Sequence, residues 1–175
     1  CGIMGTTQNF TDYTQAPANY NCDLFEDIFK AISELSGKSY KATLPESPQK
    51  MSEQESIDVA FRVIADHIRT LSCSIADGIL PGNEGRNYVL RRILRRAIMF
   101  GNQLGLRTGF FEKLVSSVVE KLGPVYPELV EQKEIIEKVI RSEEEAFGKT
   151  LDRGLALLDR VTQDGSGIIE GNAAF

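Results

Sequence analysis

Residues 83–104 read NEGRNYVLRRILRRAIMFGNQL, and this stretch decides the fold of the chain. On a helix with about 3.6 residues per turn, its apolar and basic side chains separate into two faces that do not overlap. The apolar face holds Leu90, Ile93, Leu94, Ala97, Ile98, Gly101 and Leu104. The basic face holds Arg91, Arg92, Arg95 and Arg96. We therefore predict an amphipathic helix that buries one side in a core and presents four guanidinium groups to solvent.

The basic face is unusual because the rest of the chain is acidic. Residues 86–107 contain six arginines, Arg86 and Arg107 included, and no Asp, Glu or Lys, so their charge is +6. The whole chain carries −5, which leaves −11 for all other residues. No acid lies three or four residues from an arginine inside the segment. Either carboxylates from another segment cover this face, as Glu143–Glu145 could, or a polyanion binds it.

The other apolar patterns also predict helices, and no run of strand-like alternation is convincing. Ser52 and Glu55 have the spacing of a capping box, so a helix is expected to follow Ser52. The expected helices besides the basic one span residues 23–36, 53–76, 109–122 and 127–162. The fold class that follows is all-α, an irregular bundle of about five helices including one long C-terminal helix.

Length and composition fit a globular protein. The chain has 175 residues, of which 42% are hydrophobic and 26% charged. Its apolar runs are too short for a membrane span, and it has no signal peptide or lipidation motif. Three widely spaced cysteines and one histidine argue against a zinc site or a disulfide framework and fit a reducing cytoplasm. Because the first residue is Cys1 rather than Met, we expect a piece of a longer protein.

The sequence offers no catalytic constellation. It lacks a GxxxxGKS/T phosphate loop, a GxGxxG motif after a strand, an HExxH motif and a Ser–His–Asp set. His67 is the single histidine, and no nucleophile lies at a defined spacing from it, so we expect a structural or surface role. We predict neither a catalytic residue nor a metal ligand here.

Three segments resemble one family, the alanyl-tRNA synthetases. Residues 65–101, ADHIRTLSCSIADGILPGNEGRNYVLRRILRRAIMFG, are similar to the segment that follows the aminoacylation core. Residues 19–40, NYNCDLFEDIFKAISELSGKSY, resemble the stretch after the third class II motif. Residues 142–159, SEEEAFGKTLDRGLALLD, resemble a long later helix. The matches occur in the family's order and extend the resemblance over nearly the whole chain.

The resemblance implies a domain organisation. Residues 1–50 would be the tail of the aminoacylation region with one helix and a linker. Residues 51–165 would form the helical tRNA-recognition (middle) domain, and residues 166–175 would start a truncated following segment.

The resemblance also assigns site residues. From the residues alone, Asn83 is a turn residue in the segment 77–86. In the family, an Asn in this turn is implicated in reading the G–U wobble pair of the tRNA acceptor stem, whose shallow minor groove exposes base edges, the guanine amino group included. The tRNA backbone would be bound by Arg86, Arg91, Arg92, Arg95 and Arg96. The family pattern places an Asp partner just beyond Phe175, so we expect this piece to discriminate poorly.

The implied activity is that of an alanine–tRNA ligase, which would use ATP and Mg²⁺ in the core and zinc in an editing domain, all outside this piece. The implied partners are the acceptor stem of tRNA(Ala) and the adjoining catalytic and editing domains, in the cytoplasm and without a membrane. Two other readings stay open. The chain could be a helical module that binds RNA or DNA without base readout. It could also be a structural spacer whose arginines pair with acids of neighbouring domains.

Overall fold

The computed structural model describes residues 19–45, 47 and 50–162. These residues form six α-helices and one 3-10 turn, and none of them lies in a β-strand. The elements are α2 (Asp23–Ser36), α3 (Glu53–Ala76), α4 (Gly85–Gln103), η1 (Glu112–Leu114), α5 (Val115–Leu122), α6 (Pro127–Glu131) and α7 (Lys133–Thr162). The expected all-α bundle with one long C-terminal helix is confirmed. The expectations for Cys1 and for residues 166–175 fall outside the described residues.

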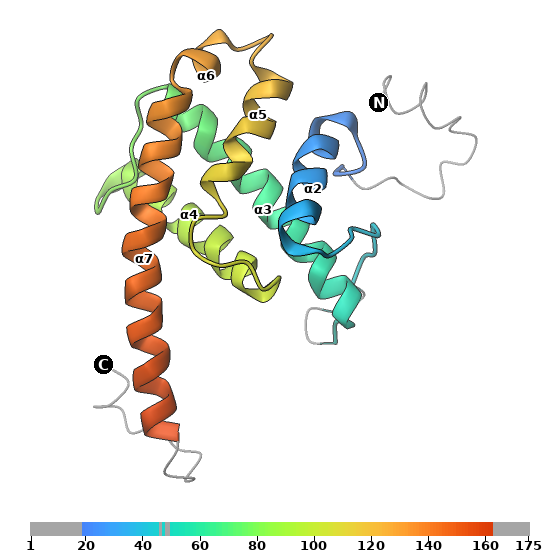
Figure 1. The fold of residues 1–175 in the computed structure, drawn as a ribbon, viewed down its shortest axis with the longest axis vertical. Coiled ribbons are helices and arrows are strands. Elements are labelled where there is room, and N and C mark those ends of the chain that lie inside the picture. The colour runs from blue at the N-terminus through green and yellow to red at the C-terminus, as the bar shows by residue number, and fades with distance from the viewer. Residues whose placement is uncertain (1–18, 46, 48–49, 163–175) are drawn as a thin grey trace, which may run out of the picture.

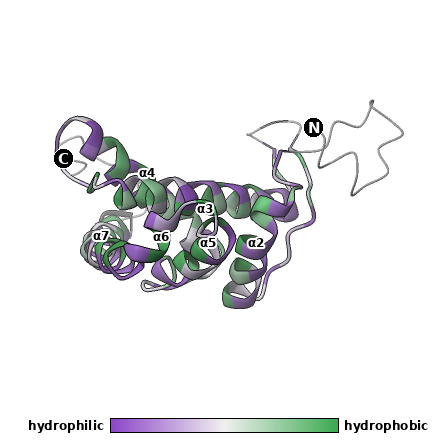
Figure 2. Cartoon of the chain, turned by 90° about the horizontal axis from the view of Figure 1, so that it is seen from above, coloured by the Kyte–Doolittle hydropathy of each residue, from purple (hydrophilic) through white to green (hydrophobic). Residues whose placement is uncertain are grey.

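The helices pack in two layers (Figures 1 and 2). α3 and α4 lie against each other in one layer, while α5 lies between α2 and α7 in the other. Contacts of α4 with α7 and of α3 with α5 join the layers. Figure 2 shows hydrophilic and hydrophobic residues on the same helices, as amphipathic helices around a shared core require.

The apolar face predicted for the basic helix is buried. Its core members in α4 are Leu90, Leu94, Ala97, Ile98 and Gly101. Gly101 allows the closest approach: a Cβ at this position would lie 2.2 Å from Cζ of Phe110. The chain returns over α4 at this point, and the Leu106 N–H donates to the Gly101 carbonyl at 3.0 Å. Glycine is therefore required here to leave room for an aromatic ring.

Both ends of α3 are fixed by local hydrogen bonds. The capping box at Ser52 is confirmed, because the Glu55 N–H donates to the Ser52 hydroxyl at 3.3 Å and the Ser52 N–H donates to the Glu55 carboxylate at 2.6 Å. At the other end, Gly78 adopts a φ of +81° and its N–H donates to the Ile75 carbonyl at 2.9 Å. These caps fix where the turn before α4 begins.

The linker before α3 is fastened to that helix by Asp58, whose side chain is fully buried. Its carboxylate accepts hydrogen bonds from the Lys41 N–H at 3.0 Å and from the Thr43 N–H at 2.6 Å. It also accepts from the Thr43 hydroxyl and from the Gln54 amide, each at 2.8 Å. Burial by itself raises the pKa of Asp58, but these hydrogen bonds outweigh it and hold the pKa below its ordinary value.

The long helix predicted for residues 127–162 is divided in two. Gln132 separates α6 from α7 with φ −99° and ψ 6°, outside helical values. Hydrogen bonds of helical spacing continue across the break, since the Ile136 N–H donates to the Gln132 carbonyl at 2.9 Å. Leu129 and Ile136 stay on one buried face. The apolar pattern therefore remains in phase and does not reveal the distortion.

α7 runs without a break through residues 142–148, although this stretch contains Gly148. Gly148 instead allows close packing, because a Cβ there would lie 2.9 Å from the Thr108 hydroxyl. Beyond this contact α7 leaves the layers (Figure 1), and residues 152–160 are all exposed. Leu155 and Leu158 of α7 therefore lie outside the core.

Candidate nucleic-acid interface

Three arginines form an exposed row on the outer face of α4: Arg92, Arg95 and Arg96. None of them has a carboxylate partner among the residues that the structure describes. Each guanidinium instead lies over an aromatic ring. The distances from the guanidinium carbon to the ring centre are 5.9 Å for Arg92 over Tyr88, 5.1 Å for Arg95 over Phe147 and 5.8 Å for Arg96 over Phe100.

The aromatic partners matter because they restrict the guanidinium groups without neutralising their charge. Arginine stacks well on aromatic faces and keeps its donors available at the ring edge. Two of the ring partners lie four residues from their arginine on α4, so helical spacing could have predicted them. Phe147 comes from α7, and only the tertiary packing brings it beneath Arg95.

Arg91 differs from the other three members of the predicted basic face. Its Nε donates to Oε2 of Glu143 at 3.0 Å, and its Nη2 donates to Oε1 at 2.6 Å. The two side chains are only 19% and 20% exposed. The hydrogen bonds that Arg91 donates to the Glu143 carboxylate raise the pKa of Arg91 above its ordinary value. The prediction of four guanidinium groups open to solvent is therefore wrong for Arg91, since an acid from α7 covers it.

The turn between α3 and α4 carries Asn83, whose side chain is exposed. Its Oδ1 accepts a hydrogen bond from Nη1 of Arg91. The turn folds back on α4, because the Gly82 N–H donates to the Asn87 carbonyl at 2.9 Å. The structure thus brings the predicted readout residue into contact with the predicted arginine helix. Arg86, in the first turn of α4, is exposed beside it.

The three glutamates of α7 that could screen the arginines have three different environments. Glu143 pairs with Arg91, and Glu145 is exposed. Glu144 is fully buried and accepts hydrogen bonds from the N–H groups of Phe110 and Phe111, both at 3.3 Å. Burial raises the pKa of Glu144, which these hydrogen bonds offset only in part. Treating the three as one solvated or screening group is therefore wrong for Glu144.

His67 lies half-buried on α3, and the described residues offer neither ring nitrogen a hydrogen bond. Burial lowers its pKa, and the charge of Arg96 lowers it further. Asp66 opposes this, but its carboxylate lies 3.7 Å from Nδ1, too far for a strong hydrogen bond. The surroundings favour a neutral imidazole with a structural role rather than an acid–base catalyst.

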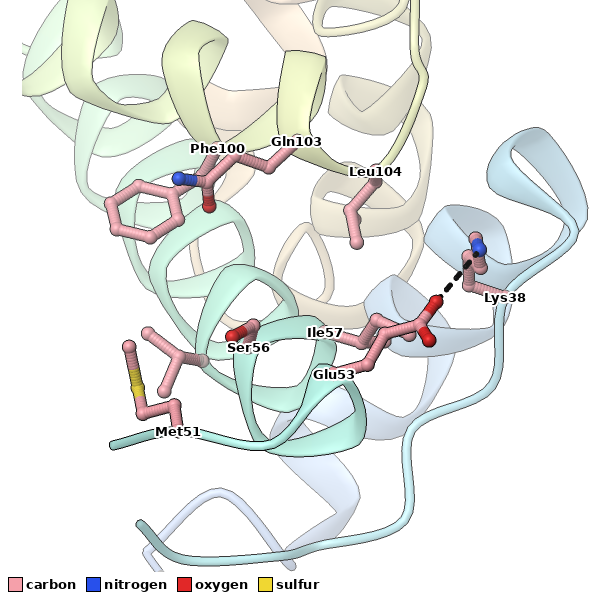
Figure 3. Close-up of a pocket in the computed structure, with 9 residues that line it drawn as sticks. Lys38, Met51, Glu53, Ser56, Ile57, Phe100, Gln103 and Leu104 are labelled. Atoms are coloured by element: carbon pink, nitrogen blue, oxygen red, sulfur yellow. Dashed lines mark ion pairs between the residues drawn. The ribbon is translucent and has the colours of Figure 1, made fainter. Parts of the chain in front are cut away.

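A pocket of about 490 Å³ lies where α4 ends and α3 begins (Figure 3). Phe100 of α4 and Leu104 just after it line one side, and Met51 and Ile57 line the other. Its charged groups, Lys38 and Glu53, form an ion pair at 4.0 Å across the rim. This lining contains no nucleophile–base pair.

Two further findings apply to the described residues alone. No described helix combines the length and the apolar character needed to cross a bilayer. In that same part of the chain, no three or more His, Cys, Asp or Glu side chains are grouped so that they could hold a metal ion.

Comparison with known proteins gives a consistent result. The family described as "tRNA synthetases class II (A)" matches residues 1–175. The alanine–tRNA ligase of Opitutus terrae is 59% identical over 158 residues, which cover 90% of this chain and 17% of that protein. The alanine–tRNA ligase of Akkermansia muciniphila is 47% identical over 179 residues, which cover 100% of this chain and 19% of that protein. The chain thus spans less than a fifth of the length of these relatives.

Proposed function

Because this chain belongs to the family of class II (A) tRNA synthetases, we propose that it is the tRNA-recognition (middle) region of an alanine–tRNA ligase and docks the acceptor stem of tRNA(Ala). The observation that carries the proposal is the exposed row of Arg92, Arg95 and Arg96, which keeps its charge on an otherwise acidic chain. The similarity to proteins named alanine–tRNA ligases supports the choice of substrate.

The row has properties that suit an RNA backbone. Its guanidinium groups sit on one rigid helix that is anchored through its apolar face, so their spacing is fixed before binding. Phosphate contacts of this kind set the register of a nucleic acid, while contacts to base edges supply specificity. Arg86 would extend the row toward the turn, and the exposed Asn83 in that turn would reach the shallow minor groove and read the G–U pair.

The proposed contribution to aminoacylation is positional. Holding the acceptor stem on α4 would bring its terminal ribose to a catalytic domain of the same protein, and such positioning is a large source of rate. In the whole ligase, ATP and Mg²⁺ would act in that catalytic domain and zinc in an editing domain. We place the whole enzyme in the cytoplasm.

One observation favours a second reading. The pair of Arg91 with Glu143 shows that acids from another helix can neutralise a member of the basic face. If acids of neighbouring domains cover the remaining arginines in the same way, the chain is a spacer that holds domains apart. A third reading is a module that binds any RNA duplex through phosphates alone.

Binding measurements separate these readings. The dissociation constant is measured for an alanine acceptor-stem duplex with a G–U pair, and for the same duplex with G–C, across a salt series. The test variant is Arg95→Ala/Arg96→Ala. The matched control is Lys30→Ala/Lys41→Ala, which removes the same charge from exposed positions on α2 and in the linker.

We expect the test variant to weaken binding and to lower the salt slope by about 0.9 for each lost phosphate contact. The control is expected to leave the slope unchanged. Equal effects of the two variants would show that the row is not the interface. Failure of the unaltered chain to bind at low salt would favour the spacer, and equal affinity for both duplexes would favour the module without base readout.

A further inference from the structure

The guanidinium of Arg91 uses three of its nitrogen atoms within the protein. Nε and Nη2 donate to the two oxygens of Glu143, at 3.0 Å and 2.6 Å, and Nη1 donates to Oδ1 of Asn83. This side chain therefore joins α7 to the turn that precedes α4. A bidentate arginine–carboxylate pair fixes the plane of the guanidinium and hence the direction in which Nη1 points.

The contact also fixes the orientation of the Asn83 amide. A guanidinium has donors and no acceptor, so the atom of Asn83 that faces it must be the carbonyl oxygen. The Nδ2 amino group is then directed away from Arg91, on a side chain that is exposed. The backbone of the turn is held separately, by the hydrogen bond from Gly82 to the Asn87 carbonyl.

We propose that Arg91 is a positioning residue, braced by Glu143, that holds Asn83 with its amino group outward, so that the turn recognises a hydrogen-bond acceptor on its ligand. This inference rests on the proposed function. It assigns Arg91 no phosphate, because its charge is compensated by Glu143 and its side chain is 19% exposed. Its neighbour Arg92 has no such partner among the described residues and stays in the phosphate-binding row.

The minor groove of a G–U pair presents both acceptors and a donor, so the orientation of the Asn83 amide determines which of these groups it can bind. Guanine N3 and uracil O2 are acceptors there, whereas the guanine 2-amino group is a donor. An outward amino group on Asn83 can bond to either acceptor, but it cannot accept from the guanine amino group. The sequence alone allowed either end of the Asn83 amide to face the RNA, whereas the contact with Arg91 occupies one lone pair of Oδ1 and leaves the amino group as the outward end.

The RNA test pairs each protein variant with a changed base. One duplex carries the G–U pair, and three others each change one group of it. Inosine–U lacks the 2-amino group, 3-deazaguanosine–U lacks N3, and guanosine–2-thiouridine has sulfur, a weaker acceptor, in place of O2. A 2′-deoxy substitution at each nucleotide of the pair separates ribose from base contacts. Dissociation constants are measured for the unaltered chain, Asn83→Ala, Arg91→Gln, Glu143→Gln and the matched control Arg92→Gln.

For the unaltered chain we expect one acceptor change to weaken binding about fivefold to tenfold, the scale of one neutral hydrogen bond. That loss is expected to disappear in Asn83→Ala and in Arg91→Gln. The inosine change is expected to have the same effect in every protein. Arg91→Gln should keep the salt slope of the unaltered chain, while Arg92→Gln should lower the slope and keep the loss on acceptor removal.

An arm without RNA tests the positioning directly. Relaxation of the Asn83 side-chain ¹⁵N in NMR spectra reports the order of its amide. We expect this order to fall in Arg91→Gln and Glu143→Gln and to stay unchanged in Arg92→Gln, with thermal melts confirming that each variant is folded.

Three results would overturn the inference. A salt slope lowered by about one in Arg91→Gln would make Arg91 a phosphate ligand. An inosine effect that vanishes in Asn83→Ala would show that the carbonyl oxygen faces the RNA. An Asn83 amide equally ordered in Arg91→Gln would remove the positioning role. If no duplex binds, the proposed function fails, and the NMR arm still decides whether Arg91 positions Asn83.

Discussion

Asp58 gives the sharpest prediction of stability, because its carboxylate is fully buried and accepts four hydrogen bonds. In Asp58→Asn the amide oxygen can replace the carboxylate oxygen that accepts from Thr43. The amide nitrogen must then face the Lys41 N–H and the Gln54 amino group, and two donors cannot bond to each other. Gln54 cannot simply turn over, since its amino group also donates to the Ser39 carbonyl at 2.9 Å.

The expected loss follows from these contacts. Two hydrogen bonds to a charged group disappear, each worth about 1.5–3 kcal/mol, and the part-buried Lys41 N–H loses its side-chain acceptor. Together they amount to about 3–6 kcal/mol, and because Lys41 is exposed, water can replace part of this loss. We therefore expect Asp58→Asn to reduce the free energy of unfolding by about 3–4 kcal/mol, the lower end of that range. For a chain of this length, such a loss corresponds to a fall in Tm of about 10 °C.

The pH dependence provides an independent check. The folded pKa of Asp58 is lowered, so its carboxylate stabilises the fold above the unfolded pKa of about 3.9, and this stabilisation is lost as the pH falls through the folded pKa. The difference in unfolding free energy between the unaltered chain and Asp58→Asn should therefore narrow in acid.

Urea unfolding at neutral pH and near pH 3 measures both effects. The control is Asp66→Asn on the same helix, whose carboxylate is 36% exposed and bonds to Arg69 at 2.9 Å. We expect this control to cost no more than about 1 kcal/mol. Equal losses for the two variants, or a difference that does not change with pH, would refute the assigned role of Asp58.

Three further predictions concern the core and the groups with shifted pKa values. Gly101→Ala should lower the free energy of unfolding by about 1–3 kcal/mol, because its Cβ would lie 2.2 Å from the ring of Phe110. The control Gly154→Ala should raise the free energy of unfolding by up to about 1 kcal/mol, since nothing lies within 4 Å of its Cβ. Urea unfolding curves that shift in the same direction for both variants would contradict this. The raised folded pKa of Glu144 means that stability falls as the pH rises from about 4.3 through that pKa, and Glu144→Gln should remove this slope in a pH series of unfolding curves. The lowered folded pKa of His67 means that stability is lost as the pH falls below about 6.5 toward that pKa, and His67→Gln should flatten unfolding midpoints between pH 5 and 7.

Local features of the fold were predictable because they depend on neighbours in the chain. The 3.6-residue period identified the buried face of α4, including the fully buried Leu94 and Ala97. The spacing of Ser52 and Glu55 identified the start of α3, because a capping box is closed by two hydrogen bonds three residues apart. Such contacts form in the same way wherever the segment lies in the fold.

Other features depend on contacts between distant segments, and no local pattern encodes them. Three consecutive glutamates, Glu143–Glu145, cannot be told apart in the sequence. Packing against α4 pairs Glu143 with Arg91, and packing against the turn before η1 gives Glu144 two backbone N–H donors. The same holds for Arg95, whose ring partner Phe147 comes from α7. The domain boundaries at residues 50 and 165 stay a prediction.

The four arginines on the predicted basic face of α4 differ in whether a carboxylate compensates their charge. Among the described residues only Arg91 of the four on the predicted face has an opposing carboxylate, so a spacer would take the carboxylates for the other three arginines from neighbouring domains. The other three sit on aromatic rings, which restrict their motion and leave their charge uncompensated. The single internal pair is also the one next to Asn83. If the chain docks RNA as proposed, an acid placed there would remove one phosphate ligand from the row and give the proposed readout turn a fixed orientation. Phosphate contacts would then position the nucleic acid while a separate group reads its bases.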